Sequence, residues 1–245
     1  MMAPPAPNNG GAREEGAASS APTGVSFLVP PLLGAGGASQ GLFLTFEGVE
    51  GAGKTTQIAR LAARLRDAGR QDVLTTREPG DGPLGQELRQ LALHPPMGLH
   101  VEPRAELLIM LADRAQHVGQ VIRPHLESGG IVLCDRYADS SVAYQGYGRG
   151  LDIGEIVYLN TYATGGLQPE LTILLDLDPT VGLARQSERN VMEDQALPFH
   201  QRIRAGFQAL AKAESERWLV LDASRLPEIV HQDIWDAVSS RLHDL

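Results

Sequence analysis

Residues 48–55 read Gly-Val-Glu-Gly-Ala-Gly-Lys-Thr and match the pattern Gly-x-x-x-x-Gly-Lys-Ser/Thr at every defined position. An apolar run at 42–46 precedes them and predicts a buried strand, and helical spacing follows over residues 58–68. In this strand–loop–helix context, glycines let successive backbone N–H groups point at phosphate oxygens, and the helix adds the positive end of its dipole. The stretch therefore predicts a phosphate-binding loop for a nucleoside triphosphate.

The residues of this loop have distinct expected tasks. Lys54 can reach the β- and γ-phosphates, and the Thr55 hydroxyl can bind Mg²⁺. The phosphates would be bound by Gly48, Val49, Glu50, Gly51, Ala52, Gly53, Lys54, Thr55 and Thr56. A chance glycine turn is the alternative, but the flanking strand and helix favour the phosphate loop. GTPases, ATPase motors and small-molecule kinases share such a loop, so other residues must identify the reaction.

Composition argues against several classes of protein. The net charge of -9 disfavours a general nucleic-acid binder, which would need a basic face for the phosphates. The two lysines, Lys54 and Lys212, do not form an Asn-Lys-x-Asp motif for reading guanine, which disfavours a GTP switch. The single cysteine, Cys134, permits no intrachain disulfide and fits a reducing cytosol, so we expect a cytoplasmic protein. Cys134 lies in an apolar run and is expected to be buried.

The first forty residues differ in composition from the rest of the chain. Residues 1–40 are rich in Ala, Pro, Gly, Ser and Asn, which predicts a disordered low-complexity tail. The apolar run at 25–33 is short and is interrupted by two prolines, so it is not expected to span a membrane. A mis-assigned start is an equal alternative to a genuine appendage.

Strands and helices are expected to alternate from residue 41 onward. Further strands are predicted at 72–76, 131–134, 171–177 and 218–221. Helices are predicted at 84–93, 104–126, from about 180, at 196–213 and at 227–242. This alternation predicts a doubly wound parallel sheet of the α/β class with helices on both faces.

Asp135 and Arg136 follow the predicted strand at 131–134, at the edge where ligands bind to parallel sheets. Asp135 can act as a Mg²⁺ ligand together with Thr55, or it can cap the next helix. The phosphate loop favours the metal role. Arg136 can clamp a transferring phosphoryl group.

A second charged segment, Arg77-Glu78-Pro79-Gly80, follows the strand at 72–76. It should reach the same edge of the sheet, where Arg77 could bind a second phosphate with two hydrogen bonds. Taken alone, the segment could also be an ordinary loop.

These segments together resemble the thymidylate kinase family. The resemblance is carried by residues 46–57, 77–80, 112–117, 135–146 and 169–177, which occur in the family's order and spacing. It extends over residues 41–245 and leaves the tail uncovered. It implies a P-loop kinase fold with a five-stranded parallel sheet and a short lid at about 185–197.

The resemblance implies that the protein uses ATP and Mg²⁺ to phosphorylate dTMP. It also implies a homodimer, with the long helix at 104–126 at its interface. Two alternatives remain open: another nucleoside monophosphate or deoxynucleoside kinase, and a non-catalytic nucleotide-binding regulatory protein.

The family's functional residues map onto individual positions of this chain. Arg77 would hold the dTMP phosphate, Arg114 the thymine edge, and Arg136 both the acceptor phosphate and the γ-phosphate. Tyr144 would pack against the deoxyribose and exclude a 2′-hydroxyl, and Gln145 would line the nucleoside pocket. The other implied dTMP-binding residues are Glu47, Glu78, Pro79, Met110 and Ser140. The implied metal residues are Thr55, Asp135 and Glu50.

Two departures from the family pattern stand out. Met110 occupies the position of an aromatic residue that stacks on thymine, so weaker or less selective base binding is expected. In the lid, Val191 stands where an arginine is usual. We expect Arg189 or Arg185 to supply the missing catalytic charge, although both could simply solvate an exposed helix end.

Overall fold

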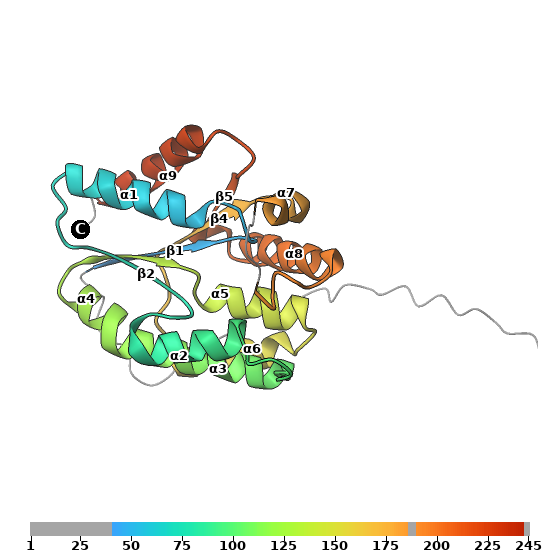
Figure 1. The fold of residues 1–245 in the computed structure, drawn as a ribbon. Helices are drawn as coiled ribbons and strands as arrows, with labels where there is room; N and C mark the ends of the chain where they lie inside the picture. Colours follow the sequence, from blue (N-terminus) through green and yellow to red (C-terminus); the bar gives the residue numbers. More distant parts are fainter. Residues whose placement is uncertain (1–40, 186–189, 243–245) are drawn as a thin grey trace, which may run out of the picture.

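The computed structural model describes residues 41–185 and 190–242 (Figure 1). Five parallel strands form one sheet in the order β2-β3-β1-β4-β5. Their bounds are β1 Leu42–Glu47, β2 Val73–Arg77, β3 Ile131–Asp135, β4 Leu171–Asp176 and β5 Trp218–Asp222. The predicted α/β class and parallel sheet are confirmed. The predicted tail lies outside the described residues.

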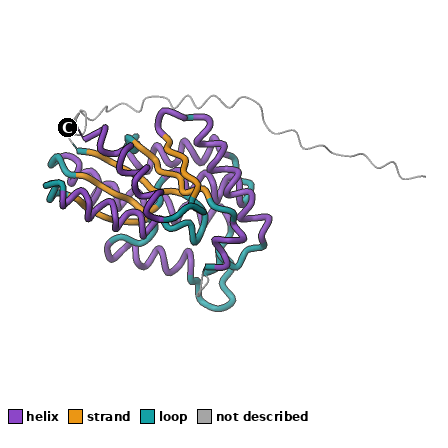
Figure 2. The backbone as a smooth tube through the Cα atoms, turned by 90° about the horizontal axis from the view of Figure 1, so that it is seen from above, coloured by secondary structure: helices purple, strands orange, loops and turns teal. Residues whose placement is uncertain are grey.

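Helices cover both faces of the sheet. In Figure 1, α1 and α9 lie above the sheet, and α2, α3, α4 and α6 lie below it; the strands run side by side in Figure 2. The α-helices are α1 Lys54–Asp67, α2 Gly82–Leu93, α3 Pro103–His117, α4 Arg123–Glu127, α5 Ala138–Ser141, α6 Ile153–Thr164, α7 Pro179–Ala184, α8 Leu197–Ala213 and α9 Pro227–Leu242. No described helix is long and apolar enough to cross a membrane.

The core explains why the strands carry few polar residues. Every residue of β1 is buried, because both of its faces are covered by helices. Leu44 and Phe46 belong to the large apolar cluster that includes Leu61 of α1. Phe43 points the other way and packs with Ile122 and Leu126 below the sheet. This double burial fixes the strand register, since a shift of one residue would exchange the two faces.

The carboxyl ends of three strands meet beside the phosphate loop. Asp135 at the end of β3 is the register partner of both Phe46 in β1 and Arg77 in β2. Strands β2 and β3 lie on one side of β1, and strands β4 and β5 lie on the other side. The crevice therefore lies where the strand order changes direction, the usual ligand site of open α/β sheets.

Several predicted helices differ from the structure. The helix predicted at 104–126 is α3 and α4 joined by a π-helical turn, Val118–Ile122. Pro124 has no N–H to continue the α-helical ladder, and the wider turn accommodates its ring. Helix α1 begins at Lys54, four residues before the predicted start, because Gly53 ends the loop in a left-handed conformation with φ 94°.

Helices α5 and α6 and the π-helical segment Val142–Gly148 were not predicted. Signals for α6 are nevertheless present. Asp152 caps its start by accepting a hydrogen bond from the Glu155 backbone N–H, and Gly165 ends it in a left-handed conformation.

Candidate active site

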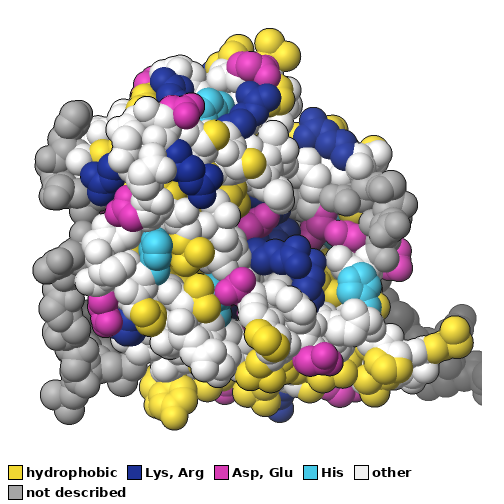
Figure 3. All heavy atoms as spheres, turned by 60° about the vertical axis from the view of Figure 1, so that its left-hand side comes forward, with side chains coloured by type: hydrophobic (Ala, Val, Ile, Leu, Met, Phe, Trp, Pro, Cys, Tyr) yellow, Lys and Arg dark blue, Asp and Glu magenta, His cyan; other side chains and the backbone are white. Residues whose placement is uncertain are grey.

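A cavity of about 710 Å³ opens at the carboxyl ends of β1, β2 and β3. Figure 3 shows basic and acidic side chains gathered in a hollow on one face of the molecule. Both charge signs line the cavity, with Lys54 and Arg136 beside Glu50 and Asp135. Its size is typical of pockets for small organic ligands.

The phosphate loop is tightly folded around its own lysine. Nζ of Lys54 donates to the carbonyl oxygens of Gly48 and Val49, each at 3.0 Å. Burial and the nearby Arg136 guanidinium lower the pKa of Lys54 to about 8. A bound polyphosphate would supply the negative charge that favours the protonated lysine.

Helix α7 packs directly on this loop through two glycines. A Cβ on Gly51 would stand 2.3 Å from the carbonyl oxygen of Gly182, and one on Gly182 would stand 2.1 Å from that of Glu50. Gly51 also has φ 69°, which side-chain-bearing residues rarely adopt. Helix α7, which precedes the predicted lid segment, therefore contacts the phosphate loop through its backbone.

Thr55 and Asp135 form the pair that the sequence suggested. Oγ1 of Thr55, in the first turn of α1, donates to Oδ2 of Asp135, at the end of β3, at 3.0 Å. Hydroxyl and carboxylate oxygens are the ligands Mg²⁺ prefers, usually together with water and substrate phosphates. No group of three or more His, Cys, Asp or Glu suited to hold a metal occurs within the described ranges. The pair offers two oxygen ligands of the kind that Mg²⁺ binds.

Glu50 is turned toward a different set of partners. Its Oε1 accepts hydrogen bonds from the Tyr144 hydroxyl at 2.5 Å and from Nη2 of Arg136 at 3.3 Å. Burial alone would raise the pKa of Glu50, but His200, Arg136 and Lys54 hold it well below its usual value. Glu50 is thus an ionised carboxylate inside the phosphate loop, and it orients the groups around it.

Arg136 lines the cavity and is held by several contacts. It adopts φ 70°, an uncommon backbone conformation for a non-glycine residue, and its guanidinium lies 4.9 Å from the Tyr144 ring centroid. Nη1 donates to Oγ of Ser140 at 3.2 Å. Ser140 in turn donates to Oε2 of Glu47 at 2.6 Å.

Glu47 is fully buried behind this wall. Burial raises its pKa to about 7, although the Arg136 charge acts in the opposite direction. The Tyr137 backbone N–H donates to Oε1 of Glu47 at 2.8 Å. Glu47 therefore supports the backbone and Ser140 around Arg136 and does not itself line the cavity.

A buried ionic network forms the other end of the cavity. Oε2 of Glu78 accepts a hydrogen bond from Nε of Arg114 at 2.7 Å. Its Oε1 lies 2.9 Å from Nδ1 of His117, whose Nε2 lies 2.7 Å from Oγ1 of Thr76. Arg114, Glu78 and His117 are each at most 4% exposed.

Arg114 is further fixed by three residues outside that network. Nη1 donates to Ser141 at 2.9 Å and to Asn160 at 2.5 Å, and Nη2 donates to the Tyr137 carbonyl oxygen at 2.9 Å. With the bond to Glu78, these contacts engage four of the five guanidinium N–H groups. Arg114 lines the cavity with its orientation already set.

Sequence similarity to known proteins agrees with this geometry. A sequence model of the family "Thymidylate kinase" matches residues 46–234. The chain belongs to the thymidylate kinase family.

Two relatives and one solved structure illustrate the similarity. The chain is 54% identical over 208 residues to the thymidylate kinase of Deinococcus radiodurans, covering 84% of this chain and all of that protein. It is 51% identical over 211 residues to that of Solidesulfovibrio magneticus, covering 82% of this chain and all of that protein. The crystal structure of thymidylate kinase from Ehrlichia chaffeensis matches with a TM-score of 0.68 and 33% identity, covering 81% of this chain and 98% of that one.

Most residues predicted from the thymidylate kinase pattern share the cavity. Those that line it are Glu50, Gly51, Gly53, Lys54, Thr55, Thr56, Arg77, Glu78, Pro79, Met110, Arg114, Asp135, Arg136, Ser140, Tyr144 and Gln145. Gly48, Val49 and Ala52 belong to the loop without lining the cavity, and Arg185 donates to the Gly51 carbonyl oxygen at 2.9 Å. Arg189 lies outside the described residues.

The sequence prediction missed two charged cavity residues, one on α2 and one on α3. Arg89 lines the cavity, donates to the Pro79 carbonyl oxygen at 2.8 Å, and has its pKa lowered by burial and by the nearby Arg77 and Arg136. Asp113 accepts from the Gly80 N–H at 3.0 Å, and burial together with Glu78 raises its pKa to about 6. Periodicity assigned the segments that carry both residues to helices, and it gave no sign that these two side chains turn toward a site.

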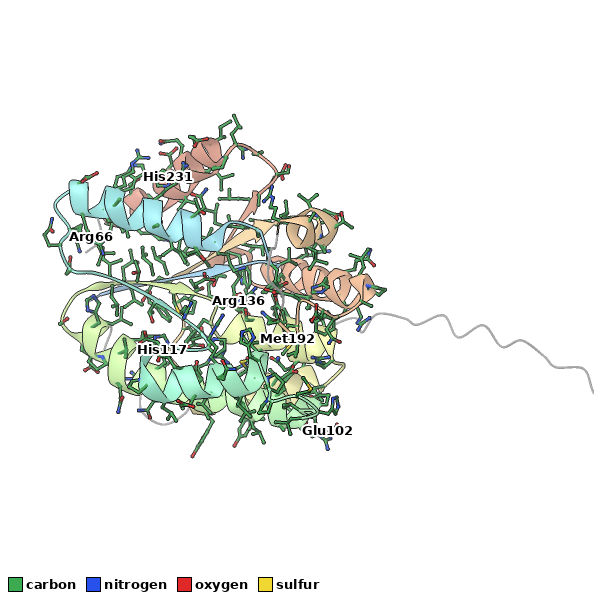
Figure 4. All side chains as sticks on the ribbon, viewed as in Figure 1. Arg66, Glu102, His117, Arg136, Met192 and His231 are labelled. Carbon is green, nitrogen blue, oxygen red and sulfur yellow. The ribbon has the colours of Figure 1, made fainter. Side chains whose placement is uncertain are left out.

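The described residues of the predicted lid segment also contribute to the cavity. Asn190, Met192 and Glu193 line it, and Figure 4 shows Met192 and Arg136 in this region. The Val191 N–H donates to the Leu93 carbonyl oxygen at 3.2 Å. Val191, which stands where the family usually has an arginine, therefore contacts the end of α2 through its backbone N–H.

Proposed function

We propose that this protein transfers the γ-phosphoryl group of ATP to dTMP, in the presence of Mg²⁺. The proposal rests chiefly on Arg136, which bonds to Glu50 of the phosphate loop and lines the same cavity as the buried Arg114. The choice of dTMP as the acceptor rests on the name of the relatives, thymidylate kinase. Production of dTDP would serve dTTP synthesis.

The donor end of the cavity comprises Glu50, Lys54, Thr55 and Asp135. Lys54 and the loop N–H groups would bind the β- and γ-phosphates of ATP. Thr55 and Asp135 would hold Mg²⁺, with Glu50 close by, and the metal would neutralise charge on the phosphates. Burial of Lys54 strengthens its attraction for the phosphates, because little water screens it.

The acceptor end comprises Arg77, Glu78, Arg89, Met110 and Arg114. Arg77 and Arg89 would bind the dTMP phosphate, since both are cations at the cavity wall. Arg114, whose orientation is already set, would face the thymine edge, and Met110 would contact the base. Across the cavity, Tyr144 would contact the deoxyribose and Gln145 the nucleoside.

The reaction would be an in-line transfer to an oxygen of the dTMP phosphate. That oxygen is already anionic, so no strong general base is required. Lys54 and Arg136 would neutralise the charge that spreads over the transferring group, and their fixed positions would provide most of the rate enhancement. Glu50 would keep Arg136 directed between donor and acceptor.

A homodimer is part of the proposal. Helices α2, α3 and α6 pack side by side, and they expose large apolar side chains, namely Leu84, Leu91, Leu108, Tyr158 and Tyr162. Burying these side chains against a second copy would remove apolar area from water. A cytoplasmic location follows from the site of nucleotide synthesis and is likewise proposed.

The first experiment measures ADP release from ATP·Mg²⁺ with dTMP, dUMP, UMP or thymidine as the acceptor. We expect turnover with dTMP to exceed turnover with the others. Lys54→Ala should lower it about a thousandfold or more, because the transition-state charge loses its nearest cation. Lys212→Ala, which removes an exposed lysine on α8, is the matched control. Preference for another acceptor would support a different nucleotide kinase, and ATP binding without turnover would support a regulatory protein.

A further inference from the structure

Glu50 and His200 face each other in the interior with unpartnered polar atoms. Within the described ranges, neither Oε2 of Glu50 nor either ring nitrogen of His200 has a hydrogen-bond partner, and all three atoms are buried. Nδ1 of His200 lies 3.6 Å from Oε2 of Glu50. That separation exceeds a normal hydrogen bond of about 2.7–3.2 Å. Buried polar groups without partners are costly, so a small movement that joins these two atoms would be favourable.

The position of His200 connects the lid to the phosphate loop. His200 lies in the first turn of α8, and a short segment of the chain joins it to Glu193, which lines the cavity. Its neighbour Phe199 contacts the Tyr144 ring edge-on, with ring centroids 6.4 Å apart. A short displacement of this turn would therefore move His200 relative to Glu50.

The other oxygen of Glu50 explains what such a contact would accomplish. Oε1 already accepts from Tyr144 and Arg136. A carboxylate held through only one oxygen can rotate about its last torsion, whose preference is broad. A donor at Oε2 would stop that rotation and thereby fix the direction of the Arg136 guanidinium.

We propose that His200 is a positioning residue for phosphoryl transfer: its Nδ1–H donates to Oε2 of Glu50 when nucleotides are bound, and this bond aims Arg136 at the transferring group. The reaction in this statement rests on the function proposed above. The ring also fills space beside Phe199, with centroids 5.5 Å apart, so packing and hydrogen bonding must be separated experimentally.

Two substitutions separate the two roles of His200. His200→Phe keeps a ring of similar size but removes the donor, and His200→Asn keeps a nitrogen near the position of Nδ1 but removes the ring. We expect His200→Phe to lower kcat roughly ten- to hundredfold, with KM values for ATP and dTMP changed less than about threefold. His200→Asn should retain kcat within about threefold of the wild type. The opposite order, with Phe tolerated and Asn impaired, would show a packing role and overturn the proposal.

A double-mutant cycle with Glu50→Gln tests whether the effect passes through Glu50. If it does, His200→Phe should change kcat less than about twofold in the Glu50→Gln background. Multiplicative losses in the double variant would contradict the proposal. The thermal unfolding midpoint of each variant confirms that the protein compared is folded.

A measurement without turnover separates this inference from the proposed reaction. The ¹⁵N signals of His200 would be recorded with a non-hydrolysable ATP analogue, Mg²⁺ and dTMP, and assigned with His200→Phe. We expect a protonated Nδ1, with a signal that shifts in Glu50→Gln. An unprotonated Nδ1, or no response to Glu50→Gln, would overturn the inference even if the enzyme turns over. Lack of turnover in the wild type would instead count against the proposed reaction.

Discussion

The two ends of the cavity differ in how their charged side chains are partnered. At the acceptor end, Glu78 bonds through both oxygens to Arg114 and His117, and Arg114 uses four of its N–H groups. At the donor end, Lys54 bonds only to carbonyl oxygens of its own loop, and Oε2 of Glu50 has no hydrogen-bond partner within the described residues. The acceptor end is thus completed by folding, whereas we propose that bound nucleotides and His200 complete the donor end.

This difference predicts where mutations act. Removing an acceptor-end partner should leave a buried charge uncompensated and reduce stability. Removing the Lys54 charge should reduce turnover with little effect on stability, because its bonds in the described structure go to carbonyl oxygens of its own loop. Functional sites often retain such unsatisfied groups, since their partners belong to the transition state.

The largest expected effect concerns the lid arginines. We expect Arg189→Ala or Arg185→Ala to lower kcat about a thousandfold, as the loss of an arginine that stabilises transferring phosphate does. The thermal midpoint should stay close to that of the wild type. Arg60→Ala is the control, since Arg60 pairs with Glu228 on the surface of α1 and α9. Near-normal turnover in both lid variants would mean that neither arginine supplies the charge.

An intermediate effect is expected at the acceptor end. Glu78→Gln removes the carboxylate that pairs with Arg114 at 2.7 Å, which should lower the free energy of unfolding by about 3 kcal/mol. Urea denaturation measures this change directly. Glu228→Gln removes an exposed carboxylate and should leave stability essentially unchanged. Equal stability of the Glu78 and Glu228 variants would contradict the claim that folding depends on the charge pairs at the acceptor end.

The smallest effect concerns the base contact. Met110→Phe restores an aromatic ring, and stacking on thymine should lower KM for dTMP about two- to tenfold while kcat changes less than about twofold. Met97→Phe is a matched control, because Met97 is fully exposed and does not line the cavity. A higher KM in Met110→Phe would indicate that the lid and α3 are packed around methionine and exclude the ring.

Sequence patterns alone predicted the class of fold and the phosphate loop. The phosphate loop is continuous in the chain, so its residue types and spacing reveal it without any tertiary contact. The five strands were also predicted. In β1, β3 and β4, two-sided burial leaves unbroken apolar runs, whereas the edge strands β2 and β5 are only partly buried. The thymidylate kinase pattern then indicated Arg77, Arg114 and Arg136.

The partners of the charged side chains, in contrast, become evident in the folded chain alone. Arg89 reaches the cavity from α2, and Asn160 reaches Arg114 from a helix that periodicity did not reveal. The buried Glu78–Arg114 pair joins residues 36 positions apart, and Glu50 and His200 are farther apart still. Burial and charge compensation depend on which distant segments of the chain come into contact, and local sequence patterns do not reveal those contacts.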